Sequence, residues 1–144
     1  MPLEVKIVQN QQELNDAFTV RKKVFVEEQQ VPLELEIDEH EDSSAHFTLY
    51  DGEMPCGAGR FREVEGVGKA ERICILPEYR GTGAGRQMME AIESYAKSHS
   101  LPAVKLNAQT QAIPFYERIG YEIISDEFLD AGIPHKTMKK QWSN

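Results

Sequence analysis

The pattern of apolar and polar positions predicts short strands interspersed with amphipathic helices. Apolar residues alternate with polar ones from Leu3 to Gln9, a period of two that is typical of a half-buried strand. From Gln11 to about Glu28 the apolar residues recur at three- and four-residue steps behind the capping residue Asn10. We therefore predict a first strand and then an amphipathic helix, in a helical region that Pro32 ends.

The stretch that follows Pro32 is acidic. Because Leu35 and Ile37 interrupt the charges, the stretch is too mixed to be a disordered tail. We expect a loop whose charges are solvated. The carboxylates concerned are Glu34, Glu36, Asp38, Glu39, Glu41 and Asp42.

Three extended runs come next, separated by two turn signals. An Asp-Gly pair lies between the first two runs, and Glu65 to Gly68 separates the second from the third. Consecutive strands joined by tight turns form an antiparallel meander. The predicted strands are Ala45 to Tyr50, Cys56 to Glu63 and Lys69 to Leu76.

The second half of the chain alternates helices with strands. A helix with one buried face is expected between Met88 and His99, and a Gly residue closes a later, shorter helix. Strands, then a strand-helix-strand unit, make a mixed α+β sheet the natural architecture. The remaining predicted elements are a strand at Ala103 to Ala108, a short helix at Ala112 to Ile119, and strands at Tyr121 to Ile124 and Thr137 to Lys140.

Composition narrows the class of protein. The 144 residues, 40% of them hydrophobic, suit one globular domain over residues 1–144 with its core at about 3–140. The formal charge of −8 disfavours nucleic-acid binding, and acidity alone would suit a cationic substrate. No apolar run approaches the roughly 20 residues that span a bilayer, and the N-terminus lacks a signal-peptide pattern. We expect a cytoplasmic protein without membrane contact.

Metal binding is not indicated. The cysteines Cys56 and Cys74 lie in different segments without ligand spacing, which is typical of reduced, buried thiols. The histidines His40 and His46 likewise lack the compact spacing of a metal site.

The segment from Ile73 to Arg86 carries the clearest chemical signal. An apolar strand leads into a loop with three alternate glycines, and a helix begins directly afterwards. Glycines allow a close backbone approach, and the helix N-terminus adds about half a positive charge. This layout predicts an anion site that would suit a pyrophosphate.

Other readings of the same loop fit less well. A Walker loop needs Lys and then Ser or Thr after its last glycine, whereas Gly85 is followed by Arg86. A dinucleotide-binding fingerprint needs a third glycine where Arg86 stands. A merely flexible turn would not explain the helix that begins at once, or the Arg80 that precedes the glycines.

The spacing Arg80, two residues, Gly83, one residue, Gly85 resembles the acyl-CoA pyrophosphate loop of the GNAT superfamily of N-acetyltransferases. A second match follows in order, because Asn107-Ala108 at a strand end and the run 114–121, Pro-Phe-Tyr-Glu-Arg-Ile-Gly-Tyr, are similar to a later motif of that superfamily. Residues 21–29 and 132–138 resemble most the bacterial ElaA-like and YjcF-like branch. The resemblance covers roughly residues 3–140.

The resemblance implies a GNAT-type fold, with a twisted mixed sheet of six to seven strands and about four helices. It implies an N-acetyltransferase that moves the acetyl group of acetyl-CoA to a primary amine of a small molecule or peptide. The amine would attack the thioester directly, and CoA would be the product. The alternative is a non-catalytic acyl-CoA-binding sensor or interaction module on the same fold. The sequence leaves open whether the chain forms a homodimer.

The same resemblance assigns residues to the cofactor. Backbone groups of Cys74 and Ile75 would bond the pantetheine arm, and the Ile75 N–H could stabilise a thioester oxyanion. Asn107 could bond a cofactor amide, although an ordinary strand-end residue fits as well. The pyrophosphate would be surrounded by Arg80, Gly81, Thr82, Gly83, Ala84 and Gly85.

Two residues are expected at the reacting atoms. Tyr116 matches the tyrosine that superfamily members often use as general acid, and its alternative is a packed ring with a satisfied hydroxyl. Glu71, just upstream of the cofactor strand, is our expected general base, with an exposed strand carboxylate as its alternative.

Four residues are expected to contact the acceptor. Arg21, Phe25 and Glu28 lie at helical spacing, and a similar Arg and Phe grouping occurs in acyl-homoserine-lactone synthases, which share the fold. The alternative is a core Phe beside a solvated charged face. His135 could approach from the last loop as a base or substrate contact, or lie on the surface.

Overall fold

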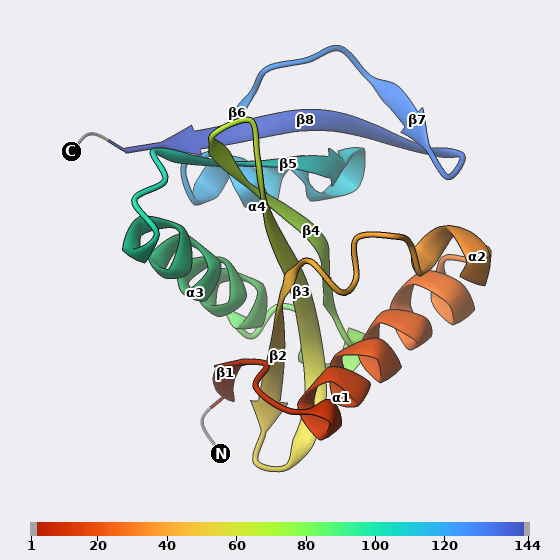
Figure 1. Cartoon of the computed structure of the whole chain (residues 1–144). Helices are drawn as coiled ribbons and strands as arrows, with labels where there is room; N and C mark the ends of the chain where they lie inside the picture. The colour runs from red at the N-terminus through yellow and green to blue at the C-terminus, as the bar shows by residue number, and fades with distance from the viewer. Residues whose placement is uncertain (1–2, 143–144) are drawn as a thin grey trace.

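The structure is a computed structural model that describes residues 3–142, and within this range eight strands form one mixed sheet (Figure 1). The strand order is β1-β2-β3-β4-β5-β8-β6, with β7 paired to β8. The strands are β1 Leu3–Ile7, β2 Ala45–Asp51, β3 Met54–Val64, β4 Val67–Ile75, β5 Ala103–Gln109, β6 Glu122–Ile123, β7 Phe128–Asp130 and β8 Ile133–Gln141.

The predicted helices are present, and the short helix α2 is an addition in the acidic stretch that was predicted to be a loop. The Asn10 side chain accepts a hydrogen bond from the Glu13 N–H at 2.8 Å and so caps the first helix, which becomes π-helical in its second half. No helix between residues 3 and 142 is long and apolar enough to cross a membrane. The helices are α1 Gln11–Arg21, the π-helix η1 Lys22–Glu28, α2 Leu33–Glu36, α3 Ala84–Ser98 and α4 Ile113–Arg118, with 3₁₀ turns η2 Pro77–Tyr79 and η3 Thr110–Ala112.

The predicted fold class and topology are confirmed. Strands β2, β3 and β4 form the antiparallel meander, and β4, α3 and β5 form a strand-helix-strand unit whose strands are parallel. The sheet has eight strands within the described range, not six to seven, because the short β6 and β7 both pair with β8. The strand predicted at Tyr121 to Ile124 contains β6, whereas the three-residue β7 was not predicted, because so short a strand leaves no periodic signal in a sequence.

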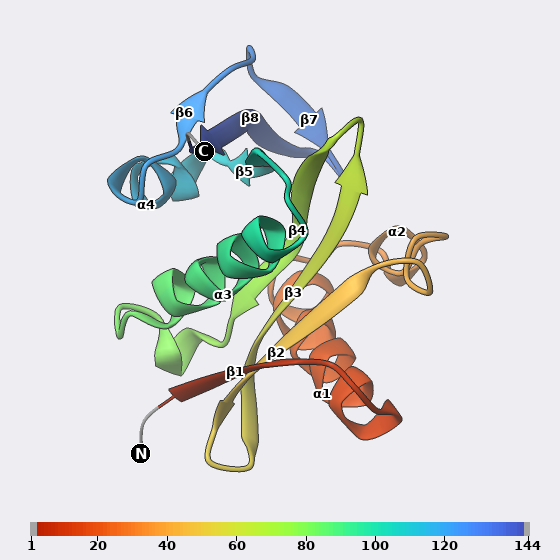
Figure 2. The ribbon, with the colours of Figure 1, turned by 60° about the vertical axis from the view of Figure 1, so that its left-hand side comes forward.

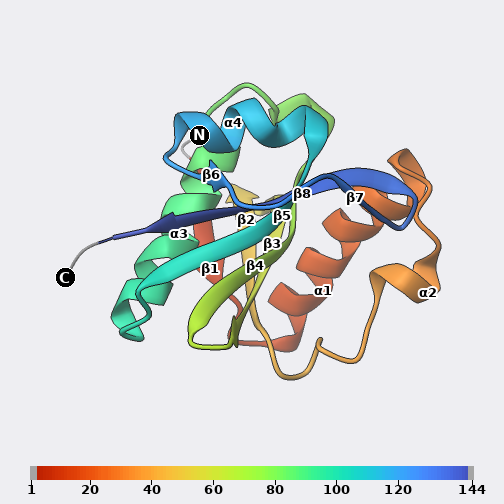
Figure 3. The same ribbon diagram turned by 90° about the horizontal axis from the view of Figure 1, so that it is seen from above.

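Helices cover the two faces of the sheet unequally. Figures 2 and 3 place α3 and α4 on one side and α1 on the other. On the α3 side, Phe47 and Phe61 meet the Tyr95 ring edge-on at 5.6 and 5.3 Å between centroids. The fully buried residues on α3 are Met88, Met89, Ile92 and Ala96.

The expectation of a solvated acidic loop is wrong for Glu36, Asp38 and Glu41. The Glu36 carboxylate is buried and accepts a hydrogen bond from the Arg21 guanidinium at 2.6 Å, while Glu41 lies 2.8 Å from the same group. Arg21 on α1 has no exposed surface. A buried guanidinium needs carboxylate partners, and these residues supply them.

A second buried guanidinium extends this network across the sheet. Arg60 on β3 lies 2.7 Å from Asp38, 2.9 Å from Glu41 and 2.8 Å from Glu71. Arg72 on β4 joins through Glu36 at 2.9 Å. We call Arg21, Glu36, Asp38, Glu41, Arg60, Glu71 and Arg72 the buried charge network. It fastens the α2 region to α1, β3 and β4.

The network predicts how stability responds to acid. Burial alone raises the pKa of Glu41, but the hydrogen bond and charge of Arg21 outweigh burial and lower that pKa to about 2, from an ordinary 4.5. Because the folded-state pKa is depressed, the stabilisation is present above the unfolded-state pKa and is lost as the pH falls toward 2. Urea denaturation should therefore show the free energy of unfolding falling less steeply between pH 4.5 and 2 in Glu41→Gln than in the unchanged protein.

Glu34→Gln is the control for that experiment, because Glu34 is exposed and makes no ion pair with the described residues. It should leave the slope of stability against pH unchanged. Parallel curves for the unchanged protein and Glu41→Gln would contradict the ion-paired state of this carboxylate.

Candidate active site

The site begins where β4 and β5 separate. These parallel strands are paired only from Gly68 to Ala70 on β4. Beyond that point β4 stays with β3, since Cys74 pairs with Ala58, while β5 stays with β8. A cavity of about 1050 Å³ opens between the two strands and is closed at its sides by η1, the start of α3, α4 and β8.

A bulge in β4 accompanies the separation. Residues Arg72 and Ile73 on β4 together oppose the single residue Gly59 on β3. Arg72 has φ of 57°, a left-handed conformation that costs about 1–2 kcal/mol in a residue other than glycine. This bulge was not predicted from the sequence. Its only signal is Gly59, where an added Cβ would lie 3.0 Å from the Ile73 Cδ1 atom.

The Arg72 side chain ties the bulge to the α2 region. Its Nε donates to the Glu36 carboxylate at 2.9 Å and to the Glu36 carbonyl at 3.1 Å. A second nitrogen donates to the Leu35 carbonyl at 3.2 Å. The strained backbone is therefore held by the buried charge network.

The glycine loop forms an open cradle at one end of the cavity. Gly81 and Gly83 have φ of 78° and 86°, and an added Cβ at either residue would meet no atom within 4 Å. Gly83 directly precedes α3, whose first N–H groups lack partners within the helix. At Gly85 an added Cβ would lie 3.1 Å from the Phe115 ring, so glycine allows α3 to approach α4.

Arg80 is already paired. Its guanidinium donates to both carboxylate oxygens of Glu28, at 2.7 and 2.8 Å, and its Nε donates to the Ile75 carbonyl at 3.0 Å. The hydrogen bond between the two side chains raises the pKa of Arg80 and lowers that of Glu28. Arg86 and Arg118 are exposed and line the same cavity, although neither was predicted from the sequence as a site residue.

Tyr116 presents a hydroxyl to the cavity. The residue is 8% exposed, and its ring is fixed edge-on by Phe115 and Tyr121, at 5.0 and 5.8 Å between centroids. The hydroxyl makes no hydrogen bond with any residue between 3 and 142. Burial raises the pKa of Tyr116, and nearby Cys74 adds to the effect. The phenol therefore keeps its proton and has a bonding position free for a ligand.

Glu71 also lines the cavity, but three cations hold it. Arg60 and Arg62 each lie 2.8 Å from its carboxylate, and Lys69 lies 3.2 Å away. Burial raises the pKa of Glu71, but the hydrogen bond from Arg62 and the charges of Arg60 and Lys69 outweigh burial and lower it to about 2. Such a carboxylate is a much weaker proton acceptor at neutral pH than the sequence led us to expect.

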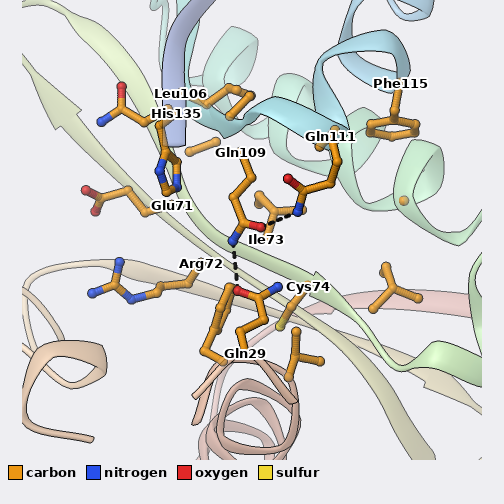
Figure 4. A pocket seen from close by; sticks show the side chains of 18 of the residues that line it. Gln29, Glu71, Arg72, Ile73, Cys74, Leu106, Gln109, Gln111, Phe115 and His135 are labelled. Atoms are coloured by element: carbon orange, nitrogen blue, oxygen red, sulfur yellow. Dashed lines mark hydrogen bonds between the residues drawn. The ribbon is translucent and has the colours of Figure 1, made fainter. Parts of the chain in front are cut away.

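His135 on β8 lies on the same wall, as Figure 4 shows. Its Nδ1 is 2.7 Å from the Ile133 carbonyl oxygen. A carbonyl can only accept, so Nδ1 carries the hydrogen and the Nε2 atom of the neutral ring keeps its lone pair. The ring stacks on Phe128 at 6.0 Å between centroids, which fixes its orientation.

The remaining expected residues divide into two groups. Phe25, Glu28, Cys74, Ile75 and Asn107 line the cavity with the residues above. Arg21, Thr82 and Ala84 do not: Arg21 belongs to the buried charge network, the Thr82 hydroxyl donates to the Tyr79 carbonyl at 2.5 Å, and Ala84 is buried at the start of α3.

A chain of amide side chains crosses the cavity (Figure 4). The side-chain amide of Gln109, at the end of β5, donates through Nε2 to the side-chain Oε1 of Gln29 at 2.8 Å. Its own Oε1 accepts from the Gln111 side chain at 2.5 Å. Gln109 and Gln111 carried no sequence signal, because a polar residue at a strand end is ordinarily a turn residue.

The chain is similar to known acetyltransferases. A family model described as an acetyltransferase (GNAT) domain matches residues 7–142. An uncharacterized N-acetyltransferase of Bacillus subtilis, YjcF, is 52% identical and covers 96% of this chain and 99% of its own length.

Two solved structures are similar in fold. ElaA of Escherichia coli is 20% identical, with a TM-score of 0.85 over 97% of this chain and 100% of its own. A Bacillus anthracis protein, provisionally described as a streptothricin acetyltransferase and solved with acetyl coenzyme A, is 17% identical, with a TM-score of 0.63 over 69% of this chain and 63% of its own.

The bulge makes a prediction about two matched substitutions. Arg72→Ala and Arg72→Gly both remove the ion pairs, but only glycine relieves the left-handed strain. We expect Arg72→Gly to be more stable than Arg72→Ala by about 1 kcal/mol in urea denaturation. At Lys6, an exposed strand position, the same pair should show the ordinary order, with glycine the less stable. The ordinary order at Arg72 would mean that the bulge does not form.

Proposed function

Because the chain belongs to the GNAT acetyltransferase family, in its ElaA-like and YjcF-like branch, and is an acyltransferase, we propose that it transfers the acetyl group of acetyl-CoA to a primary amine of a small molecule or peptide. The observation that carries the proposal is the Tyr116 hydroxyl, which is protonated, faces the cavity and has no partner in the described part of the chain.

The residues present suit acetyl-CoA. The cradle of Gly81 and Gly83 is open and adjoins the positive end of a fifteen-residue helix, as a pyrophosphate requires. Arg86 and Arg118 provide cationic groups nearby, since Arg80 is paired with Glu28. The cavity of about 1050 Å³ is at the upper end of the range for ligand sites.

The open edge of β4 would hold the acyl arm. Leu76 N–H donates to the Cys56 carbonyl on β3 at 2.9 Å. Successive N–H groups of a strand point to opposite sides, so the Ile75 N–H points away from β3 toward the cavity. This N–H could donate to the thioester oxygen as negative charge develops there. When bound, acetyl-CoA supplies the activated acyl group.

Two side chains would move protons. The Tyr116 hydroxyl would give its proton to the departing thiolate, and it still holds that proton at neutral pH because burial raises its pKa. His135 Nε2 would take the proton from the acceptor amine, because its Nδ1 is fixed by the Ile133 carbonyl. We propose that Glu71, held by three cations, orients this wall of the cavity and does not take the proton.

A substitution in the cradle tests the cofactor. Gly83→Asp adds negative charge where the pyrophosphate would lie, so we expect calorimetry to show micromolar acetyl-CoA binding for the unchanged protein and none for the variant. Gly66→Asp is the matched control, because Gly66 has a similar φ of 83° and equally open space but lies in the β3–β4 turn. No binding by the unchanged protein would overturn the proposed function.

Tyr116→Phe tests turnover. Removing the general acid should lower kcat about 10²- to 10⁴-fold, with acetyl-CoA binding unchanged, when CoA release is followed with a thiol reagent and a panel of amines. Tyr121→Phe is the control, because its hydroxyl is bonded to Glu93 at 2.9 Å and does not line the cavity. Binding without turnover on any amine would favour the acyl-CoA-binding module instead.

A further inference from the structure

Four cationic side chains lie side by side across neighbouring strands. In the register of the sheet, Arg62 on β3 lies opposite Lys69 on β4. Lys69 in turn lies opposite Lys105 on β5, and Lys105 lies opposite Lys139 on β8. Residues paired in this way project from the same face of a sheet. We call Arg62, Lys69, Lys105 and Lys139 the basic row.

The row is poorly neutralised. Glu71 pairs with Arg62 and Lys69, but it is shared with Arg60. Lys105 and Lys139 form no ion pair with the carboxylates of residues 3–142, although the exposed Glu122 on β6 is the register partner of Lys139. Like charges directly opposite one another destabilise a sheet. A row of this kind therefore lacks a structural reason.

One member of the row lies on the cavity wall, and the other three lie beside it on the same face of the sheet. Lys69 itself lines the cavity. Asn107 and His135 also line it, and they stand two and four residues along the same strand faces from Lys105 and Lys139. The glycine loop follows the opposite end of β4, so the row is remote from the place proposed for the cofactor phosphates.

We propose that the basic row binds an anionic group of the acceptor, so that the substrate is an amine that also carries a carboxylate or a phosphate. This inference rests on the proposed function, because it places the amine beside His135. Lys139 lies four residue steps beyond His135, about 13 Å along β8, and lysine side chains can reach back. The anionic group would therefore lie about 10 Å from the amine.

The test uses peptides with a free amino terminus. In an extended chain the backbone of the third residue lies about 7 Å from the terminal nitrogen, and its side-chain acid group reaches about 10 Å. The probes are Gly-Gly-Glu-Glu, its uncharged isostere Gly-Gly-Gln-Gln, and a peptide of the same length with phosphoserine at the third position. We expect kcat/KM to be about tenfold higher for the charged peptides, which corresponds to two or three partly exposed charge contacts. A difference between the two charged peptides distinguishes phosphate from carboxylate recognition.

Variants locate the effect. The double variant Lys105→Gln, Lys139→Gln should lose the preference for charged peptides while its melting temperature stays the same or rises, since a like-charged row is relieved. Lys136→Gln is the matched control, because it is on β8 but pairs with Ala108 and faces the other side of the sheet. The control should keep the preference. In the unchanged protein, added salt should reduce the preference.

The outcomes separate the two proposals. Equal turnover of charged and uncharged peptides, or a preference that survives in the double variant, would contradict the inference that the basic row binds the acceptor. Neither result would contradict the proposed acetyltransferase function. If acetyl-CoA binds but no peptide is acetylated, calorimetric titration of the same peptides into the CoA complex decides, and equal affinity for the charged and uncharged forms overturns the inference. Absence of acetyl-CoA binding overturns the proposed function itself.

Discussion

The early separation of β4 from β5 is the constraint on which the site depends. Three residue pairs hold the two strands together, and the bulge at Arg72 and Ile73 follows directly on β4. Beyond it, one edge of β4 has no neighbouring strand. Main-chain groups removed from water need partners, so this edge suits a ligand with amides of its own. The glycine loop, which we propose as the phosphate site, lies at the same cavity because it follows the end of β4.

The buried charge network keeps this geometry in place. Arg72 occupies a strained backbone conformation, and its guanidinium is bound by Glu36, which in turn binds the fully buried Arg21 on α1. The bulge, α1 and the α2 region are therefore mechanically connected. The same network explains the state of Glu71. Its lowered pKa follows from the cations Arg60, Arg62 and Lys69 that hold it, so the carboxylate is a weaker base but has a fixed position.

The sequence predicted the parts of the molecule that rest on local physics. Hydrophobic period, turn residues and helix caps placed nearly every long element. The glycine spacing located the loop, and the family resemblance of residues 114–121 selected Tyr116. It failed where the partner is distant in the chain. Nothing near Arg21 or Glu36 indicates that they meet, and the charge of the acidic stretch is typical of a surface loop. The bulge could not be predicted for the same reason, because it depends on how β4 pairs with β3, where Gly59 lies opposite Arg72 and Ile73.

Net charge is a poor guide to what the cavity attracts. The chain has a formal charge of −8, which taken alone would suit a cationic acceptor. Much of the acidity near the site is directed inward, however, where Glu36, Asp38 and Glu41 are paired with buried guanidinium groups. Exposed charges are screened over about 8 Å at physiological ionic strength, so distant carboxylates contribute little at the cavity. The local field there is set by the groups within that distance. On the cavity lining the carboxylates Glu28, Glu36 and Glu71 are ion-paired, whereas Arg86 and Arg118 make no ion pair with the residues that the structure describes.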